Sequence, residues 1–380
     1  MAATRTRAAT APERRSLLDL WPGPIALVGA LVAGLTIYLN VKSQSYAFDF
    51  RGGEWVAGRD VLAGRSPYPA PDPAHLVAVG NAYIPPPLLA VLSVPLLLLP
   101  MVPAAVVLGV VSTAALALAL RIVGVRDWRV YGLALTSFPC VSTIVLGQPD
   151  GLLALGVALA WRYRSSWRGA AAGGLVIALK LLAWPLLLWF VVTRRFRQAG
   201  VAAAVAIAAT AGSWSVIGFK GLTQYPRLLS ADATAFQARS RSVVAAAVGL
   251  GTTVHAARLL AFLVAAAVAV TVWRLASDRD LGAFAAALAF GLLSSPILWM
   301  HYLVLLFAPL AVAHKRGGAA WLLTIAFWIS PTDLPAPVWK IVCVLAVTAT
   351  LSVLAARRPR LQGAPQHAGA LPQVLPARSA

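Results

Sequence analysis

The chain has 380 residues, of which 60% are hydrophobic and 12% are charged, and its mean hydropathy is +0.79. Soluble domains are about half apolar and carry charge on about a quarter of their residues, so this composition excludes an ordinary soluble protein and indicates a membrane protein. The net charge is +20. Because the Lys and Arg residues are dispersed through loops between apolar runs and form no stripe, they follow the positive-inside rule and do not predict nucleic-acid binding.

Apolar segments recur along the whole chain. Since a helix needs about 20 apolar residues to cross about 30 Å of hydrocarbon, the sequence predicts an all-α polytopic membrane protein, a bundle of roughly 10–12 transmembrane helices. The candidate spans, several of them short, are residues 21–40, 84–99, 103–122, 130–147, 150–162, 169–192, 199–219, 255–275, 281–299, 302–313, 317–330 and 338–356. We expect residues 1–16 to be a disordered basic N-terminus, residues 17–357 to form one membrane domain, and residues 358–380 to be a disordered cytoplasmic tail.

Positive charge predicts which loops face the cytoplasm. The basic loops that share one side of a twelve-span arrangement are residues 194–197, 273–279, 314–316 and 357–360. The same arrangement places the basic residues 162–168 outside, against the rule. If that loop is inside, a segment between residues 84 and 192 must be re-entrant or split. Lys180 and Pro185 make residues 169–192 the candidate for a split.

The first outer loop, residues 41–83, is long and acidic. Its stretch AFDFRGGEWVAGRDVLAGRSPY contains Asp49, Glu54 and Asp60. The spacing of its apolar residues predicts an amphipathic helix on the membrane surface, with Asp49 and Asp60 within about 20° of one face. Asp49 is flanked by two Phe residues, and such an apolar setting favours a carboxyl tuned as a general base. For Glu54 we expect a solvated side chain.

Two sharp turns follow. Tyr83 precedes the prolines of residues 85–87, which form a rigid helix start. Residues 146–153, LGQPDGLL, interrupt two apolar runs and carry Gln148 and Asp150 at membrane level. Polar groups at that depth usually face a cavity, although a simple turn would explain the pattern equally well.

Four cationic or titratable side chains are candidates for anion binding. Lys180 lies in a long uncharged run, where a central Lys costs about 2.5–3.5 kcal/mol, and its natural partner is a phosphate or a carboxylate. His301, close to Trp299, falls near the outer surface and is either structural or positioned to contact a phosphate or hydroxyl. Arg239 and Arg241 lie in an outward loop. They suit bidentate phosphate binding, but long loops also tolerate such charge.

These motifs occur in a fixed order. They are D-F from Asp49, L-A-G-x-S-P-Y at residues 62–68, Y-x-P-P-P-L at residues 83–88, G-Q at residues 147–148, A-L-K-x-x-x-W-P ending at Pro185, and S-P-x-x-W-x-H ending at His301. Together they resemble glycosyltransferase family 87, the polyprenyl-phosphate-mannose-dependent α-(1→2)-mannosyltransferase type within the GT-C superfamily. The chain departs from that pattern at Asp150, where an Asn-like residue is expected, and at residues 239–242, where relatives often show an Asn-x-Ser-like motif.

The resemblance implies a GT-C-like helical bundle in a bacterial plasma membrane, with its active site on the extracytoplasmic side. It implies transfer of a sugar, with mannose favoured, from a polyprenyl-phosphate donor to a glycolipid or lipoglycan hydroxyl, with inversion. It assigns the catalytic base to Asp49. The leaving phosphate would be neutralised by some of Lys180, His301, Arg239 and Arg241. We expect substrate contacts from Asp60, Tyr83, Gln148 and Trp299. Membrane lipid is the other expected partner, and no metal or cofactor is expected because cationic side chains match a monophosphate.

Other functions remain open at this point. Within the same class, the donor could be decaprenyl-phosphate-arabinose, with arabinofuranosyl transfer. From other classes, the chain could be a transporter, a lipid flippase or a non-catalytic scaffold. A transporter needs a polar path across the bilayer, and Lys180 is the one charge that the sequence predicts at the centre of a span.

Overall fold

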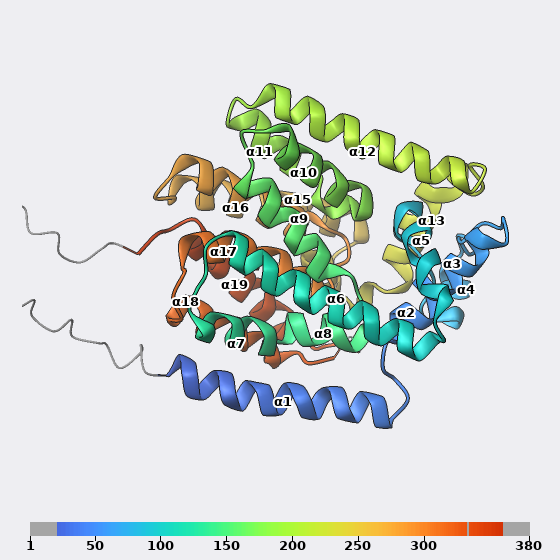
Figure 1. Cartoon of the computed structure of the whole chain (residues 1–380), viewed down its shortest axis with the longest axis horizontal. Coiled ribbons are helices and arrows are strands. Elements are labelled where there is room, and N and C mark those ends of the chain that lie inside the picture. Colours follow the sequence, from blue (N-terminus) through green and yellow to red (C-terminus); the bar gives the residue numbers. More distant parts are fainter. Residues whose placement is uncertain (1–20, 333, 360–380) are drawn as a thin grey trace, which may run out of the picture.

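The computed structural model describes residues 21–332 and 334–359, and every regular element in these ranges is helical. The long helices run along the length of the molecule, with α1 at one edge of the view and α12 at the opposite edge (Figure 1). Short helices α2 to α5 gather with α13 at one end (Figure 1). The all-α architecture is therefore confirmed. The predictions for the disordered N-terminus and for nearly all of the C-terminal tail concern residues outside the described ranges.

The α-helices are α1 Pro22–Lys42, α2 Phe48–Gly52, α3 Glu54–Leu62, α4 Pro73–Val79, α5 Pro87–Ser93, α6 Met101–Ile122, α7 Trp128–Thr136, α8 Phe138–Leu146, α9 Asp150–Arg162, α10 Trp167–Leu179, α11 Leu186–Val192, α12 Phe196–Val216, α13 Tyr225–Ala235, α14 Val243–Gly249, α15 Val254–Arg274, α16 Arg279–Ser294, α17 Phe307–Ala313, α18 Ala319–Leu322 and α19 Val338–Ala355. The 3-10 helices that matter below are η2 Val94–Leu98, η3 Leu181–Ala183, η6 Met300–Leu306 and η7 Leu323–Ile329.

Within the described residues, five helices are long and apolar enough to cross a membrane, namely α1, α6, α12, α15 and α19. A sixth span results if α7 and α8, bent by 58° between them, are counted together. The multi-pass membrane architecture is thus confirmed, but the number of full-length spans is smaller than the roughly 10–12 expected from segment length. The physical reason is that several predicted spans are short helices or pieces interrupted by proline and 3-10 turns.

The predicted split at Lys180 is present. Helix α10 ends at Leu179, and Lys180 itself has an extended backbone with φ −148° and ψ 109°. The 3-10 helix η3 follows, and α11 starts only after Pro185. Because proline lacks an N–H and clashes with the preceding turn, a continuous helix through this segment is excluded.

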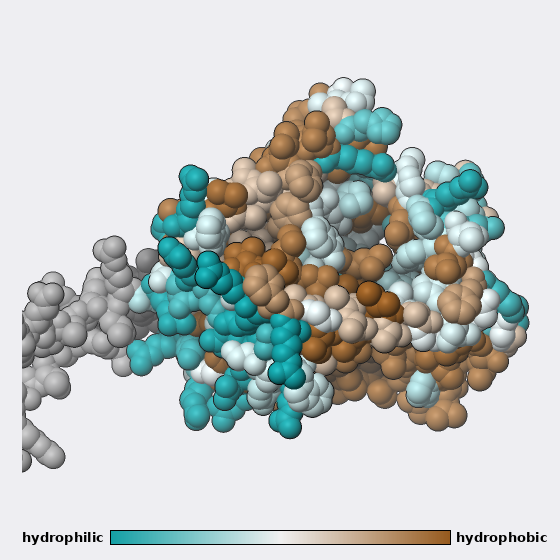
Figure 2. All heavy atoms as spheres, turned by 90° about the horizontal axis from the view of Figure 1, so that it is seen from above, coloured by the Kyte–Doolittle hydropathy of each residue, from teal (hydrophilic) through white to brown (hydrophobic). Residues whose placement is uncertain are grey.

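One end of the bundle carries the basic loops, and we call it the basic end. Arg164 and Arg195 each approach the Asp280 carboxylate to 2.6 Å, which brings residues 162–168 and 194–197 together. Figure 2 shows hydrophilic side chains gathered at this end and a hydrophobic surface beyond them. The conflict over residues 162–168 is therefore resolved, since that loop shares its side with the other basic loops.

The geometry also explains why the topology between residues 84 and 192 cannot be counted from apolar length alone. Helix α10 leaves the basic end and α11 returns to it, so the break at Lys180 turns the chain back on itself. The segment containing α5 and η2 does not cross at all, because both elements pack against α3 at the opposite end. Apolar length alone cannot distinguish such a segment from a span.

Aromatic stacking fills the core near the basic end. The Phe284 ring lies 5.0 Å from Trp161 and 4.7 Å from Trp189, all three within the main hydrophobic cluster. Helices approach closely where residues are small: a Cβ on Gly174 would lie 2.4 Å from the Ala202 carbonyl oxygen. Small residues at helix contacts are typical of membrane bundles, where close backbone approach strengthens van der Waals packing.

Candidate active site

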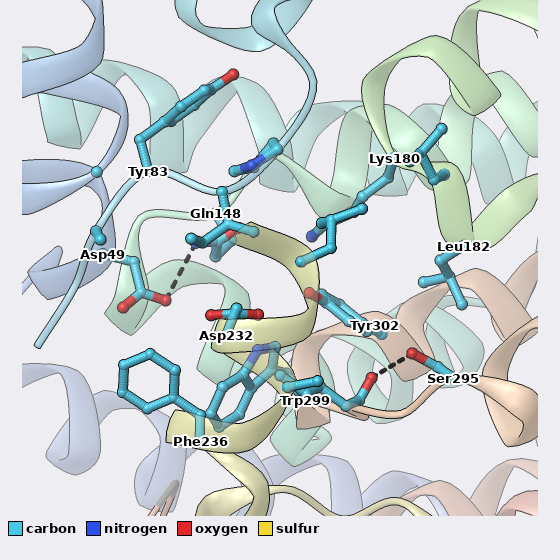
Figure 3. Close-up of a pocket in the computed structure, with 18 of the residues that line it drawn as sticks. Asp49, Tyr83, Gln148, Lys180, Leu182, Asp232, Phe236, Ser295, Trp299 and Tyr302 are labelled. Atoms are coloured by element: carbon cyan, nitrogen blue, oxygen red, sulfur yellow. Dashed lines mark hydrogen bonds between the residues drawn. The ribbon is translucent and has the colours of Figure 1, made fainter. Parts of the chain in front are cut away.

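A cavity of about 480 Å³ opens at the end opposite the basic end. Its walls come from α2 and α3, the turn between α8 and α9, the break at Lys180, α13, and the loop that enters η6 (Figure 3). The sequence-predicted residues that line it are Asp49, Tyr83, Gln148, Lys180, Arg239, Trp299 and His301. Candidate catalytic and binding residues from about two thirds of the chain thus line one cavity.

Asp49 and Gln148 are brought together as two parts of one wall. Gln148 Nε2 donates to Asp49 Oδ2 at 3.1 Å, as Figure 3 shows. The Ala47 N–H donates to the Val145 carbonyl at 2.6 Å, which joins the first outer loop to the end of α8. Gly147 has φ +75°, and a Cβ there would lie 2.7 Å from Phe50 Cβ. The glycine of the G-Q motif is therefore required both by its backbone conformation and by the close approach of the loop.

A serine from α6 holds the Gly-Gln-Pro-Asp turn. Ser112 Oγ donates to the Gln148 carbonyl at 3.1 Å and accepts from the Gly151 N–H at 3.0 Å. A Cβ on Gly151 would lie 1.8 Å from the Ser112 carbonyl, so the turn can reach α6 only with glycine at this position. Of the two interpretations left open, the cavity wall is the one that the structure supports.

The first outer loop departs from the prediction of one amphipathic helix. It forms two helices, α2 and α3, separated at Gly53. Asn81 packs against Gly52 and its Nδ2 donates to the Phe48 carbonyl, which leaves no room for a side chain at position 52. Because the helix is broken at Gly53, Asp49 and Asp60 do not lie on one helical face as their spacing predicts. Asp60 instead pairs with the exposed Arg65 at 2.6 Å and does not line the cavity.

Glu54 is the clearest error of the sequence analysis. It was expected to be solvated, but it is only 3% exposed and lines the cavity. Its Oε2 has no hydrogen-bond partner within the part of the chain that the structure describes. Burial, and then the charge of Asp49, raise the pKa of Glu54 to about 8. A side chain of this kind is neutral at pH 7 and can donate a hydrogen bond.

Lys180 is neutralised by a carboxylate that the sequence analysis did not select. Its Nζ lies 2.8 Å from Asp150 Oδ1, and His301 Nε2 lies 3.8 Å from Asp150 Oδ2. The Lys180 Nζ also sits 4.1 Å from the centre of the Tyr302 ring, a cation–π arrangement. Asp150 is fully buried. Lys180 is thus not the single charge at the centre of the bundle, because Asp150 lies beside it. The sequence feature that pointed to Asp150 was its position in the polar turn at residues 146–153.

The Arg-Ser-Arg-Ser segment divides into two roles. Arg239 lines the cavity, with its guanidinium 5.7 Å from the centre of the Phe236 ring. Arg241 is 1% exposed and lies outside the lining. It donates to Ser330 Oγ and to the carbonyls of Thr332 and Leu334. Its geometry therefore supports a structural role, joining two outer loops, rather than the phosphate contact expected from sequence.

The serines of the same segment position the loop that leads to His301. Ser240 Oγ accepts from the Leu298 N–H at 2.9 Å, and Ser242 Oγ donates to the Pro296 carbonyl at 2.8 Å. The Arg241 N–H donates to the Leu298 carbonyl at 2.9 Å. These bonds fix residues 295–299, so Trp299 and His301 enter the cavity from a rigid support.

Tyr83 and Trp299 line the cavity in different ways. The Tyr83 hydroxyl donates to the Pro86 carbonyl at 2.5 Å and accepts from the Ala90 N–H at 2.9 Å, so its polar atom holds the proline turn. Trp299 packs 6.3 Å from the Phe236 ring. Aromatic faces of this kind suit the apolar face of a sugar or an isoprenoid.

Asp232, on α13, was missed entirely. It lines the cavity and lies between Asp49 and Tyr302 (Figure 3). Burial raises its pKa to about 7. The sequence offered no signal, because an Asp in a polar outer loop is most often solvated.

Among residues 21–332 and 334–359, no three His, Cys, Asp or Glu side chains are grouped so that they could hold a metal ion. The polar side chains that line the cavity include carboxyls, an amide, a histidine and two cations.

The fold and the cavity define a polytopic helical membrane protein in which carboxyls and cations surround one cavity. Residues 83–309 match the sequence profile of Glycosyltransferase family 87, and the chain belongs to this family. It is also similar to a polyprenol-phosphate-mannose-dependent alpha-(1-2)-phosphatidylinositol pentamannoside mannosyltransferase from Mycolicibacterium smegmatis. The two are 27% identical over 343 residues, which cover 83% of this chain and 81% of the relative. No solved structure matches. The resemblance inferred from the motifs is confirmed, and the protein is a glycosyltransferase.

Proposed function

We propose that the protein transfers mannose from a polyprenyl-phosphate donor to a hydroxyl of a glycolipid or lipoglycan, with inversion, on the extracytoplasmic face of the cell membrane. The observation that carries this proposal is one cavity in which a carboxylate, Asp49, and a cation, Lys180, stand on different walls (Figure 3). A glycosyl phosphate needs both: a base for the attacking hydroxyl and positive charge for the departing phosphate.

The apolar part of the cavity supports a lipid-linked donor. Leu181 and Trp184 line the cavity, and each is 43% exposed. Both belong to the break between α10 and α11, next to Lys180. A polyprenyl chain can lie against these exposed side chains in the bilayer while its phosphate reaches Lys180. A water-soluble nucleotide sugar would need no such apolar margin.

Asp49 is the proposed base. It takes the proton from the acceptor hydroxyl as that oxygen attacks the anomeric carbon, and the bond from that carbon to the phosphate oxygen breaks. Gln148 Nε2, 3.1 Å from Asp49 Oδ2, holds the carboxylate in place. Attack opposite the leaving phosphate inverts the anomeric centre. General-base assistance of this kind contributes about 10²–10⁴-fold.

Lys180, His301 and Arg239 are the proposed phosphate side. Charge grows on the phosphate as its bond to the sugar breaks, so the fixed cations Lys180 and Arg239 stabilise the transition state more than the ground state, and the buried His301 acts as a hydrogen-bonding group. Asp150 holds Lys180 at 2.8 Å and thereby fixes its position before the donor arrives. Arg241 is not part of this site, because its guanidinium is bonded to loop carbonyls.

The distribution of charge supports the orientation. The basic end contains the loops around Arg164, Arg195 and Arg316, and the cavity lies at the other end. The positive-inside rule places the basic end in the cytoplasm and the cavity outside.

The experiment compares Asp49→Asn with Asp60→Asn in membranes supplied with polyprenyl-phosphate-[¹⁴C]mannose. Both residues lie in the first outer loop, but only Asp49 lines the cavity. We expect Asp49→Asn to lose transfer and Asp60→Asn to keep it at equal expression. Full transfer by Asp49→Asn would contradict the base assignment. Transfer only from polyprenyl-phosphate-arabinose would keep the class and replace the sugar.

A further inference from the structure

Glu54 is a buried acid without a described function. It is 3% exposed, it lines the cavity, and its Oε2 has no hydrogen-bond partner among the described residues. Asp49, beside it in the cavity, accepts from Gln148 Nε2. Asp150 Oδ2 and His301 Nδ1 also lack hydrogen-bond partners among the described residues, but Asp150 pairs with Lys180 at 2.8 Å and lies outside the cavity lining. A buried polar atom left unpaired costs about 1–3 kcal/mol. A ligand hydroxyl that supplied the missing partner would recover that cost.

The surroundings of Glu54 keep it uncharged. The groups that act on it are Asp49 on α2, Lys180 at the helix break and Asp150 at the start of α9. Tyr83 and Tyr302 face the same cavity. The elements packed directly on α3 from the other side, α5 and η2, contain no titratable side chain. Burial and the nearby Asp49 carboxylate outweigh the attraction of Lys180, so the pKa of Glu54 is raised to about 8.

The position of Glu54 in the cavity indicates which part of the substrates it contacts. Asp49 marks the proposed acceptor side of the cavity and Lys180 the proposed phosphate side, and Glu54 is within electrostatic reach of both. The group that lies between acceptor oxygen and donor phosphate is the sugar being transferred. A neutral carboxyl both donates and accepts hydrogen bonds, as a sugar hydroxyl does. An isoprenoid chain could not satisfy Oε2.

We propose that Glu54, as a neutral carboxylic acid, hydrogen-bonds a hydroxyl of the transferred sugar and so selects and orients the donor. This inference rests on the proposed function. Carboxylic acids held neutral in apolar sites are known to serve as hydrogen-bond donors in catalysis. Sites that hydrogen-bond a substrate hydroxyl discriminate strongly against analogues that lack it, because the buried partner is then unpaired.

The test uses two variants, Glu54→Gln and Glu54→Met, in purified protein reconstituted with polyprenyl-phosphate-mannose and a glycolipid acceptor. Gln keeps a donor and an acceptor, so we expect kcat/KM for the donor within about threefold of the wild type. Met has a similar length but no hydrogen-bonding capacity, and we expect a loss of about tenfold or more. Equal activity of Met and wild type would overturn the proposal.

The pH profile separates this role from a structural one. Wild-type activity should fall as pH rises through about 8, because Glu54 then ionises and loses its proton donor. Glu54→Gln cannot ionise and should lack that alkaline decrease. An unchanged alkaline limb in Glu54→Gln would overturn the assignment, and this result does not depend on whether Glu54→Met folds.

Single-deoxy donor analogues identify the contacted group. Removing the partner hydroxyl should weaken the wild type but add little to Glu54→Met, since the contact is already lost. Coupling to a deoxy acceptor in place of a deoxy donor would contradict the proposal. If the wild type itself transfers no sugar from any polyprenyl-phosphate donor, the proposed function fails, whereas normal wild-type transfer with no effect at Glu54 defeats this inference alone.

Discussion

Carboxyls at the two ends of the bundle differ in how completely they are hydrogen-bonded. At the basic end, Asp280 accepts bonds from Arg164, Arg195 and the Trp189 indole N–H, at 2.6–2.9 Å. Burial would raise the pKa of Asp280, but these bonds hold it below the usual range. At the cavity end, burial raises the pKa of Glu54 and Asp232.

This difference in hydrogen bonding distinguishes carboxyls that stabilise the fold from carboxyls that are available to a ligand. A carboxylate surrounded by protein donors is ionised and complete, and it holds loops together. A carboxyl that is buried, uncharged and unpaired stores binding capacity for a ligand, because protein interiors rarely leave polar atoms unsatisfied. Mutations at the two ends should therefore affect different measurements: stability at the basic end, and transfer at the cavity.

The largest expected effect is at Asp49. Asp49→Asn should lower kcat for transfer by about 10²–10⁴-fold, because the proposed base is lost while the Gln148 contact can be kept by an amide oxygen. Thermal unfolding in detergent should change little. Asp60→Asn serves as the control with no expected effect on either quantity. A large loss of stability in Asp49→Asn would show that this cavity carboxylate acts like those at the basic end.

Substitution of Lys180 should change both the stability of the protein and its transfer activity. Lys180→Met removes the partner of the buried Asp150 carboxylate, so we expect a loss of about 3–5 kcal/mol in stability and a loss of transfer. The double variant Lys180→Met/Asp150→Leu leaves no uncompensated charge and should recover most of the stability but not the transfer. If the double variant recovered transfer as well, Lys180 would be a structural residue and not a donor-phosphate contact.

Asp280 should affect stability only. Asp280→Asn weakens the four hydrogen bonds that this carboxylate accepts from Arg164, Arg195 and Trp189, and it should lower the free energy of unfolding by about 1.5–3 kcal/mol. The kcat/KM of the folded fraction should stay near the wild-type value, because the residue is at the end opposite the cavity. A fall in kcat/KM of Asp280→Asn at unchanged stability would contradict the view that carboxyls at the basic end affect stability alone.

The effect of Asp232 should be visible mainly in the pH dependence of stability. Its pKa is raised from 3.8 to about 7, so the folded protein retains a proton that the unfolded chain releases. The contribution of Asp232 to the free energy of unfolding therefore falls as pH rises from about 4 to 7. Asp232→Asn should lose this slope, as measured by chemical denaturation at several pH values. An identical slope in the variant would show that Asp232 is not held neutral.

Sequence reasoning succeeded where a local pattern had a single physical consequence. Apolar runs predicted membrane helices, Pro185 and Lys180 predicted the break, and ordered motifs identified the family. It failed where the outcome depended on which segment covers another. Glu54 looked solvated because it belongs to a loop with several charged residues, but the fold turns it into the cavity. Arg241 looked available to a phosphate, but it donates to the Ser330 hydroxyl and to the Thr332 and Leu334 carbonyls, 89–93 residues away.

The sequence by itself determined the class of this protein: a helical membrane glycosyltransferase with a marked carboxylate in its first outer loop. The membrane helices follow from hydropathy, and the class follows from motifs that resemble a known family. Both signals can be read from short stretches of the sequence. Only the tertiary structure decided which charges meet. Asp49 reaches Gln148 across 99 residues and Lys180 reaches Asp150 across 30. Whether a carboxyl is ionised, paired or held neutral depends on the distance to such partners and on burial, and neither quantity is a property of the residue's sequence neighbours.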